Sequence, residues 1–194
     1  DNDAGSGNES RFRCVRVIDD APPPPPPGSC TVEQDFESGS AGWTTGGTCS
    51  TGTFVLGTPT LVTNGGVTTQ VGGDNTTGSG NALFTATNSS AGVNDVDGGT
   101  CTLTSPVFSV SEASNLSLAY FHGQRDAGDD AADGMLIEVS TNGGSTFSNL
   151  VNIGDVTSNA AWTNAGSTIA AGSNVQIRVQ VTDGTAGGDL VEGG

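Results

Sequence analysis

Apolar residues in this chain occur in short alternating runs, separated by clusters of Gly, Asn, Ser and Thr. Alternation with a period of two over four to eight residues is typical of half-buried β-strands, and no stretch combines a period of 3.6 with helix caps. The pattern therefore predicts an all-β fold. The candidate strands are residues 53–56, 67–71, 82–87, 101–110, 115–122, 135–140, 146–153 and 175–182.

A hairpin is predicted around Asn142, Gly143 and Gly144, because adjacent residues that tolerate positive φ suit the tight turn between two strand-like runs. Several short strands with turn signals between them are typical of a sandwich. We expect residues 29–194 to form one two-sheet antiparallel β-sandwich, since this length suits a single core.

The N-terminus has a different organisation. Residues 1–20 contain an isolated strand-like segment, and residues 21–28 contain six consecutive prolines, Pro22 to Pro27. Proline cannot join a β-ladder, so this run predicts a polyproline II rod of roughly 19 Å at about 3.1 Å per residue. The residues of the predicted strand are Arg11, Phe12, Arg13, Cys14, Val15, Arg16, Val17 and Ile18. We call residues 1–20 the N-terminal arm.

Composition and charge exclude some partners. The 194 residues include only 33% hydrophobic residues and 31 glycines, yet the apolar residues are patterned, so the chain should fold. Five arginines, no lysine and 21 acidic residues give a net charge of -16, which repels nucleic acid. No apolar run approaches the roughly 18 to 20 residues that span a bilayer.

The cysteines indicate an extracellular or secreted protein. The four cysteines, Cys14, Cys30, Cys49 and Cys101, have no CxxC spacing and are expected to form disulfides, one of which would join Cys49 and Cys101 across two strands. No signal peptide is present, so we expect the numbering to begin on a processed chain. Four sequons are candidate glycosylation sites, namely Asn8, Asn75, Asn88 and Asn115.

An acidic loop is the main candidate cation site. Asp126, Asp129, Asp130 and Asp133 are closely spaced in a Gly-containing segment and could supply oxygen ligands for Ca²⁺. A solvated loop is the alternative, because the spacing does not match an EF-hand. The only histidine, His122, lacks a nucleophile motif or a second metal ligand, so we expect it to be structural and the protein not to be an enzyme.

Several phrases resemble the MAM-like jelly-roll domains of secreted bacterial proteins. They are DFESGSAGW, QVGGDNTTGSGNALF, DVDGGTCTLTSP, YFHGQRDAGDD and GDLVEGG, and the resemblance covers about residues 30–194. STNGGSTF is also similar to an Asp-box hairpin, with Asn142 where Asp is common. The resemblance implies that Glu37 lies near the carboxylates of an IDD phrase, here Asp19 and Asp20 of a donated arm, where Ca²⁺ would lock a junction.

In that family GDLVEGG runs into a final strand that begins with an IDD-like phrase, whereas this sequence ends at Gly194 and carries VRVIDD in its arm. A sheet without that strand would present unpaired backbone groups. We therefore expect a structural subunit of an extracellular filament, in which each arm fills the incomplete sandwich of the next copy. Cys14 of one subunit would then approach Cys30 of its neighbour.

Three alternatives stay open at this stage. The phrase RFRCVRV also resembles the last strand of a preceding domain of the C-type-lectin-like or formylglycine-generating-enzyme-like kind. The arm could instead fold back onto its own domain. The competing function is a carbohydrate-binding or adhesive module of a larger secreted protein, in which Trp43, Trp162, Tyr120 and Phe121 bind glycans, although a place in the core explains so few aromatic residues more simply.

Overall fold

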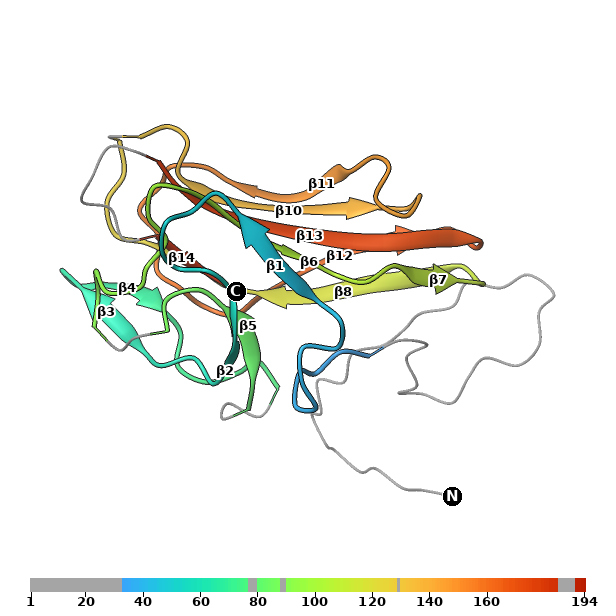
Figure 1. Cartoon of the computed structure of the whole chain (residues 1–194), viewed down its shortest axis with the longest axis horizontal. Coiled ribbons are helices and arrows are strands. Elements are labelled where there is room, and N and C mark those ends of the chain that lie inside the picture. Colours follow the sequence, from blue (N-terminus) through green and yellow to red (C-terminus); the bar gives the residue numbers. More distant parts are fainter. Residues whose placement is uncertain (1–32, 77–79, 88–89, 129, 185–190) are drawn as a thin grey trace, which may run out of the picture.

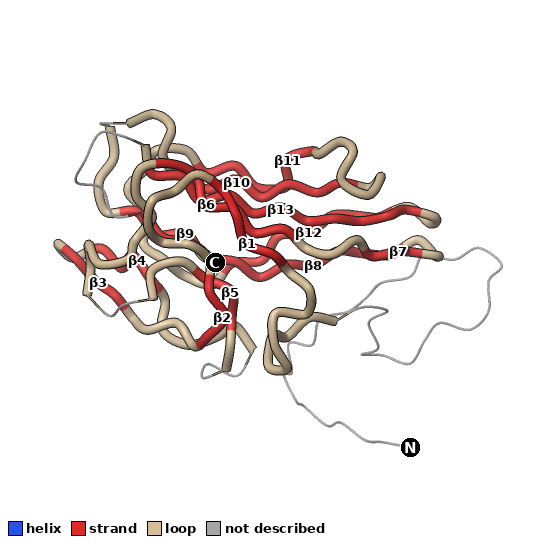
Figure 2. Tube along the Cα trace, in the orientation of Figure 1, coloured by secondary structure: helices blue, strands red, loops and turns tan. Residues whose placement is uncertain are grey.

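The structure is a computed structural model, and it describes residues 33–76, 80–87, 90–128, 130–184 and 191–194. These residues form an all-β fold with fourteen strands, which confirms the fold class expected from the pattern (Figures 1 and 2). All pairings between the strands are antiparallel. In the described part of the chain, no helix has the length and hydrophobicity needed to cross a membrane.

The main sheet has the strand order β1-β6-β13-β10-β11. Its strands are β1 (Thr44–Gly47), β6 (Gly99–Thr104), β13 (Ser173–Asp183), β10 (Gly134–Ser140) and β11 (Ser148–Ile153). From Val175 to Asp183 the central strand, β13, alternates between buried and half-buried residues, as a strand with one face on the core should. The inner face of the sheet contributes Cys101, Leu103, Met135, Ile137, Ile177, Val179 and Val181 to the main core.

A proline divides one predicted strand into two. The run 101–110 forms β6 and β7 (Phe108–Val110), and both pair with β13, at its two halves. Pro106 has no amide hydrogen to give to the ladder between them. Ser105 maintains the connection, since its Oγ accepts a hydrogen bond from the Ile177 amide at 2.8 Å. The sequence pattern predicted strand structure in residues 101–110, but not the break at Pro106 between β6 and β7.

The second layer consists of four two-stranded pairs rather than one long sheet. The pairs are β8 (Ser114–Tyr120) with β12 (Thr163–Ile169), β9 (His122–Gln124) with β14 (Val191–Gly193), β2 (Val55–Gly57) with β5 (Ala82–Phe84), and β3 (Val62–Asn64) with β4 (Val67–Gln70). β8 and β9 are separated only by Phe121. Figure 1 shows β8 lying against the main sheet, with β2 to β5 beyond its end.

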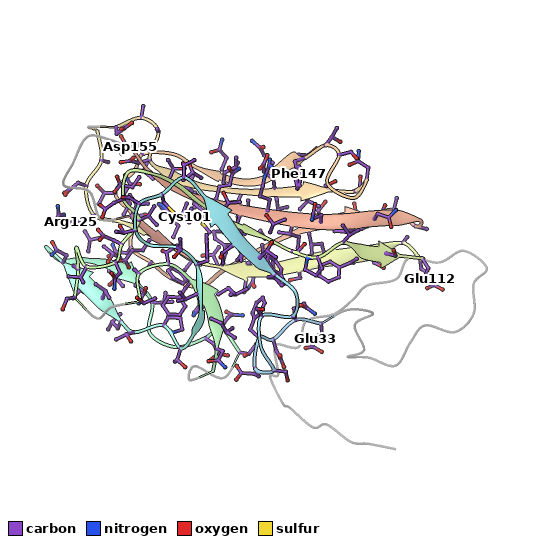
Figure 3. All side chains as sticks on the ribbon, viewed as in Figure 1. Glu33, Cys101, Glu112, Arg125, Phe147 and Asp155 are labelled. Atoms are coloured by element: carbon purple, nitrogen blue, oxygen red, sulfur yellow. A yellow bond between two sulfur atoms is a disulfide. The ribbon has the colours of Figure 1, made fainter. Side chains whose placement is uncertain are left out.

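The hairpin predicted at Asn142 is present between β10 and β11. Gly143 and Gly144 have φ angles of 71° and 88°, which residues with a side chain rarely adopt. The Asn142 side chain organises the turn, because its Oδ1 accepts hydrogen bonds from Ser140 Oγ at 2.8 Å and from the Thr146 amide at 2.9 Å. Phe147 (labelled in Figure 3) follows the turn and stacks under the Arg178 guanidinium at 4.1 Å.

Replacing Asn142 by alanine is expected to lower the free energy of unfolding by about 1 to 2 kcal/mol, because the Thr146 amide and the Ser140 hydroxyl lose their acceptor. Urea unfolding measures the change. Asn149→Ala, at an exposed position of β11, is the matched control and should change the value by less than about 0.5 kcal/mol. Equal effects of the two substitutions would contradict this role of Asn142.

The disulfide expected between Cys49 and Cys101 is present, with the two Cα atoms 5.1 Å apart. It joins the loop after β1 to β6, and Cys101 is fully buried between the layers (Figure 3). The other two cysteines, Cys14 and Cys30, lie outside the described residues.

Candidate functional site: an open strand edge at β8

The strand β14 lies in the second layer between β9 and the residue that follows β5, Thr85. On one side it pairs with β9, and on the other the Thr85 amide donates to the Gly193 carbonyl at 2.9 Å. The ladder ends in a closed pair, because the Gly194 amide donates to the Phe121 carbonyl at 3.2 Å and the Phe121 amide donates to the Gly194 carbonyl at 2.8 Å. Gly194 thus lies opposite Phe121, the residue that follows the last residue of β8.

Gly194 is held tightly at this point. A Cβ atom on it would lie 2.7 Å from Cε1 of Phe121 and 2.9 Å from the carbonyl oxygen of Leu83 in β5. Contacts this short are essentially never seen for a real Cβ, so only glycine fits without a shift of the backbone. The end of β14 is therefore packed between Phe121 and β5 (Figure 1).

The backbone of β8 presents hydrogen-bonding groups along the same edge. In an antiparallel ladder, alternate residues direct their N–H and C=O groups to the same side. Phe121 directs both groups toward Gly194, so Ala119 and Ser117 direct theirs to that side as well. Among the described residues β8 pairs with β12 alone, on the opposite side. We call the Ala119–Ser117 side of the strand the β8 edge.

The apolar side chains of β8 are less covered than those of the sheet they face. Leu116, Leu118 and Tyr120 pack against the main core but are only partly buried, whereas Val179 and Val181 of β13 are 5% and 0% exposed. A strand next to the β8 edge would cover these three side chains further. Within the described residues, Ala119 and Ser117 thus have no second strand to pair with, and the apolar surface beside them is incompletely covered; an edge of this kind can accept another strand.

Two buried acids lie beside this site. Glu192 of β14 is 1% exposed, and burial raises its pKa to about 7, with the nearby Asp95 carboxyl adding to the rise. Burial, and next the charge of Asp97, also raises the pKa of Asp95. His122 of β9 is 5% exposed, and burial lowers its pKa to about 4. The sequence analysis singled out His122 but not Glu192, whose burial follows from the position of β14.

The described acids of the predicted cation site are engaged with other groups. Asp126 forms an ion pair with Arg125, Asp130 accepts a hydrogen bond from the Ala132 amide at 2.9 Å, and Asp133 accepts one from the Gly184 amide at 2.7 Å. Glu37 accepts one from the Asn81 amide at 2.7 Å. Within the described ranges, no three His, Cys, Asp or Glu side chains are grouped closely enough to hold a metal ion. The calcium site stays a prediction.

The aromatic residues considered for glycan binding are packed into the protein. Trp43 is 8% exposed and forms an edge-to-face pair with Phe36 at 5.8 Å between ring centroids. Phe121 is fully buried and meets Trp162 in the same way at 5.2 Å, while the Trp162 indole donates to the Gly73 carbonyl at 3.2 Å. Tyr120 is partly buried against the main core. Trp43 and Phe121 thus belong to the interior, whereas Tyr120 and Trp162 are partly exposed.

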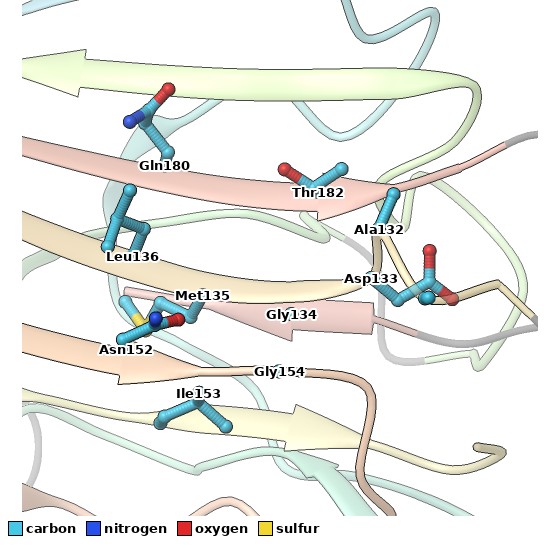
Figure 4. A pocket seen from close by; sticks show the side chains of 11 residues that line it. Ala132, Asp133, Gly134, Met135, Leu136, Asn152, Ile153, Gly154, Gln180 and Thr182 are labelled. Carbon is cyan, nitrogen blue, oxygen red and sulfur yellow. The ribbon is translucent and has the colours of Figure 1, made fainter. Parts of the chain in front are cut away.

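A shallow pocket of about 230 Å³ lies at one end of β10, β11 and β13 (Figure 4). Met135, Ile153, Asn152, Gln180 and Thr182 line it, and its one carboxylate belongs to Asp133. That carboxylate accepts the hydrogen bond from the Gly184 amide described above.

The remaining sequence predictions fall mostly outside the described residues. The predicted strand of the arm, Asp19, Asp20, Asp129 and the sequon residues Asn8 and Asn88 belong to this group. Asn75 lies half-buried beside Asp74, and Asn115 lies half-buried on β8. No model of a known protein family matches the chain, and no curated protein matches it. The resemblance to MAM-like domains therefore stays a prediction, and the fold and the β8 edge carry the argument about function.

Proposed function

We propose that this protein is a structural subunit of an extracellular filament, and that the arm of one copy pairs with the β8 edge of the next. The observation that carries the proposal is the β8 edge itself, where Ala119 and Ser117 present backbone groups beside the half-buried Leu116, Leu118 and Tyr120. Strand addition to such an edge supplies main-chain hydrogen bonds and pockets for alternate side chains.

Charge favours the arm as the occupant. Three of the five arginines, Arg11, Arg13 and Arg16, belong to the arm, whereas residues 29–194 contain 16 acids and only Arg125 and Arg178. In the described structure both of these arginines are paired with acids, Asp126 and Glu138. A basic strand that approaches an acidic domain associates faster and selects its partner.

The geometry of such a contact leads to an open chain. The donor segment and the β8 edge are different surfaces of the same molecule, so the contact is head-to-tail and repetition gives a filament rather than a closed dimer. A polyproline II rod at residues 22–27, as the sequence predicts, would keep donor and domain apart and disfavour a short return of the arm to its own edge. The Cys49–Cys101 disulfide supports the extracellular setting, where such bonds persist.

Deleting residues 1–20 is expected to abolish filaments and leave a monomeric domain, because the strand that fills the β8 edge is removed. Electron microscopy and size-exclusion chromatography measure the result. Deleting residues 1–8 alone is the matched control, since it shortens the arm but keeps residues 11–18, and filaments should persist. Filaments formed without residues 1–20, or monomers formed by the intact chain, would contradict the proposal.

A further inference from the structure

We infer that the donated arm runs antiparallel to β8, with Val15 opposite Leu118 and Val17 opposite Leu116. This inference rests on the proposed function and gives it a direction and a register. It depends on three features described above: the closed pair at Gly194, the alternation along β8, and the order of arm and proline rod in the sequence.

The direction follows from what lies at the two ends of the β8 edge. At the Tyr120 end the path is closed by Gly194, which is packed between Phe121 and Leu83. At the other end β8 begins at Ser114, close to Glu112 at the tip of the molecule (Figure 3). The six prolines expected to form a polyproline II rod follow the donated strand in sequence, and such a rod could not turn back past Gly194, so it would leave at the Ser114 end. Only an antiparallel arm places Pro22 at the Ser114 end.

The small, polar residues at the start of the arm suit the Tyr120 end of β8, where Gly194 leaves little room. Residues 1–10 contain Gly, Ser, Asn and Asp at most positions, and such residues turn easily. Antiparallel pairing also agrees with β14, which runs antiparallel to β9 along the same side of the same backbone. The arm would thus extend the existing β9–β14 ladder along β8.

The register follows from the two faces of the arm. Residues opposite each other in an antiparallel pair share a face of the sheet, so the core-facing Leu116 and Leu118 require two apolar partners spaced by two. Val15 and Val17 meet this requirement, and the same register places Arg13 opposite Tyr120, which is only partly buried at the Gly194 end of the strand. The same register places Cys14 opposite Ala119 and Arg16 opposite Ser117, both on the outer face, where Ser117 is exposed.

The register can be tested with an engineered disulfide between the arm of one subunit and β8 of another. A donor subunit keeps Cys14 and carries Cys30→Ser, and an acceptor subunit carries Cys14→Ser, Cys30→Ser and Ala119→Cys with a distinguishing tag. In an antiparallel pair the Cα atoms of opposite residues lie about 4.5 to 5.5 Å apart, within the range for a disulfide. Mild oxidation is therefore expected to give a covalent heterodimer, detected by non-reducing electrophoresis and mass spectrometry.

An acceptor with Ser117→Cys is the matched control, because it places a thiol on the same outer face two residues away. It should react several-fold more slowly with Cys14. Melting temperatures of both acceptors show whether the fold is kept. Faster reaction at position 117, or no reaction at either position in subunits that still form arm-dependent filaments, would overturn the register while leaving the proposed function in place. Loss of arm dependence would instead overturn the proposed function.

Discussion

Replacing Cys49 and Cys101 by alanine is expected to lower the free energy of unfolding by about 4 kcal/mol. The bridge closes a loop with a sequence separation of 52, and the chain entropy that this removes from the unfolded state corresponds to about that value. Since a domain of this kind has a total stability of roughly 5 to 15 kcal/mol, the loss is a large fraction of it. Urea unfolding under oxidising conditions measures the difference.

Reduction of the unmodified protein gives a second route to the same state. The reduced protein and the alanine variant should unfold at closely similar urea concentrations, because both lack the same cross-link. A double variant as stable as the oxidised protein would show that the loop between β1 and β6 is held in place without the disulfide. Cys101 is fully buried, so the packing around β6 should be monitored by near-UV circular dichroism.

Replacing Glu192 by glutamine is expected to stabilise the protein at pH 8 to 9 and to have little effect near pH 4. Burial raises the pKa of Glu192 from 4.5 to about 7, so the folded protein holds this proton more tightly than the unfolded chain. The contribution of the group is therefore fully present below pH 4.5 and is lost as the pH rises through about 7. The shift corresponds to roughly 3 kcal/mol, which the variant should regain at high pH.

Thermal and urea unfolding of both proteins between pH 4 and pH 9 measures this dependence. Glu33→Gln removes the same charge from an exposed position and separates the effect of burial from that of net charge. A difference between wild type and Glu192→Gln that does not grow with pH would rule out a buried, proton-binding carboxyl at this position. The buried His122 acts in the opposite sense, because its lowered pKa costs stability as the pH falls from 6.5 through about 4.

The parts of the fold that the sequence predicted are those with strong periodicity. β10, β13 and the hairpin at Asn142 combine alternating apolar residues with a turn that requires positive φ. β1, with the sequence TTGG, and β12, with TNAGSTI, carry too few apolar residues to be recognised. Both become strands because a neighbouring strand, β6 or β8, provides the ladder, which is tertiary context that a local pattern does not contain.

The candidate site was reached from the sequence only through a resemblance. Nothing in the residues of β8 indicates that one of its sides is open, because the pairing of each edge is a property of the whole sheet. The half-burial of Leu116, Leu118 and Tyr120 became visible in the structure. The buried Glu192 was missed for the same reason, since its phrase VEGG has the composition of an exposed turn and yet passes through the interior.

The long central strand β13 has a consequence for how the chain reaches its folded state. Its partners β6, β7 and β10 are all distant in sequence, as the pairs Thr104 with Arg178 and Gly99 with Asp183 illustrate. Closing such large loops costs entropy before any contact compensates for it, which places proteins of this topology in the slow class, with folding times of milliseconds to seconds. The β10–β11 hairpin is local and can form early, whereas the β9–β14 pair joins segments that are distant in sequence.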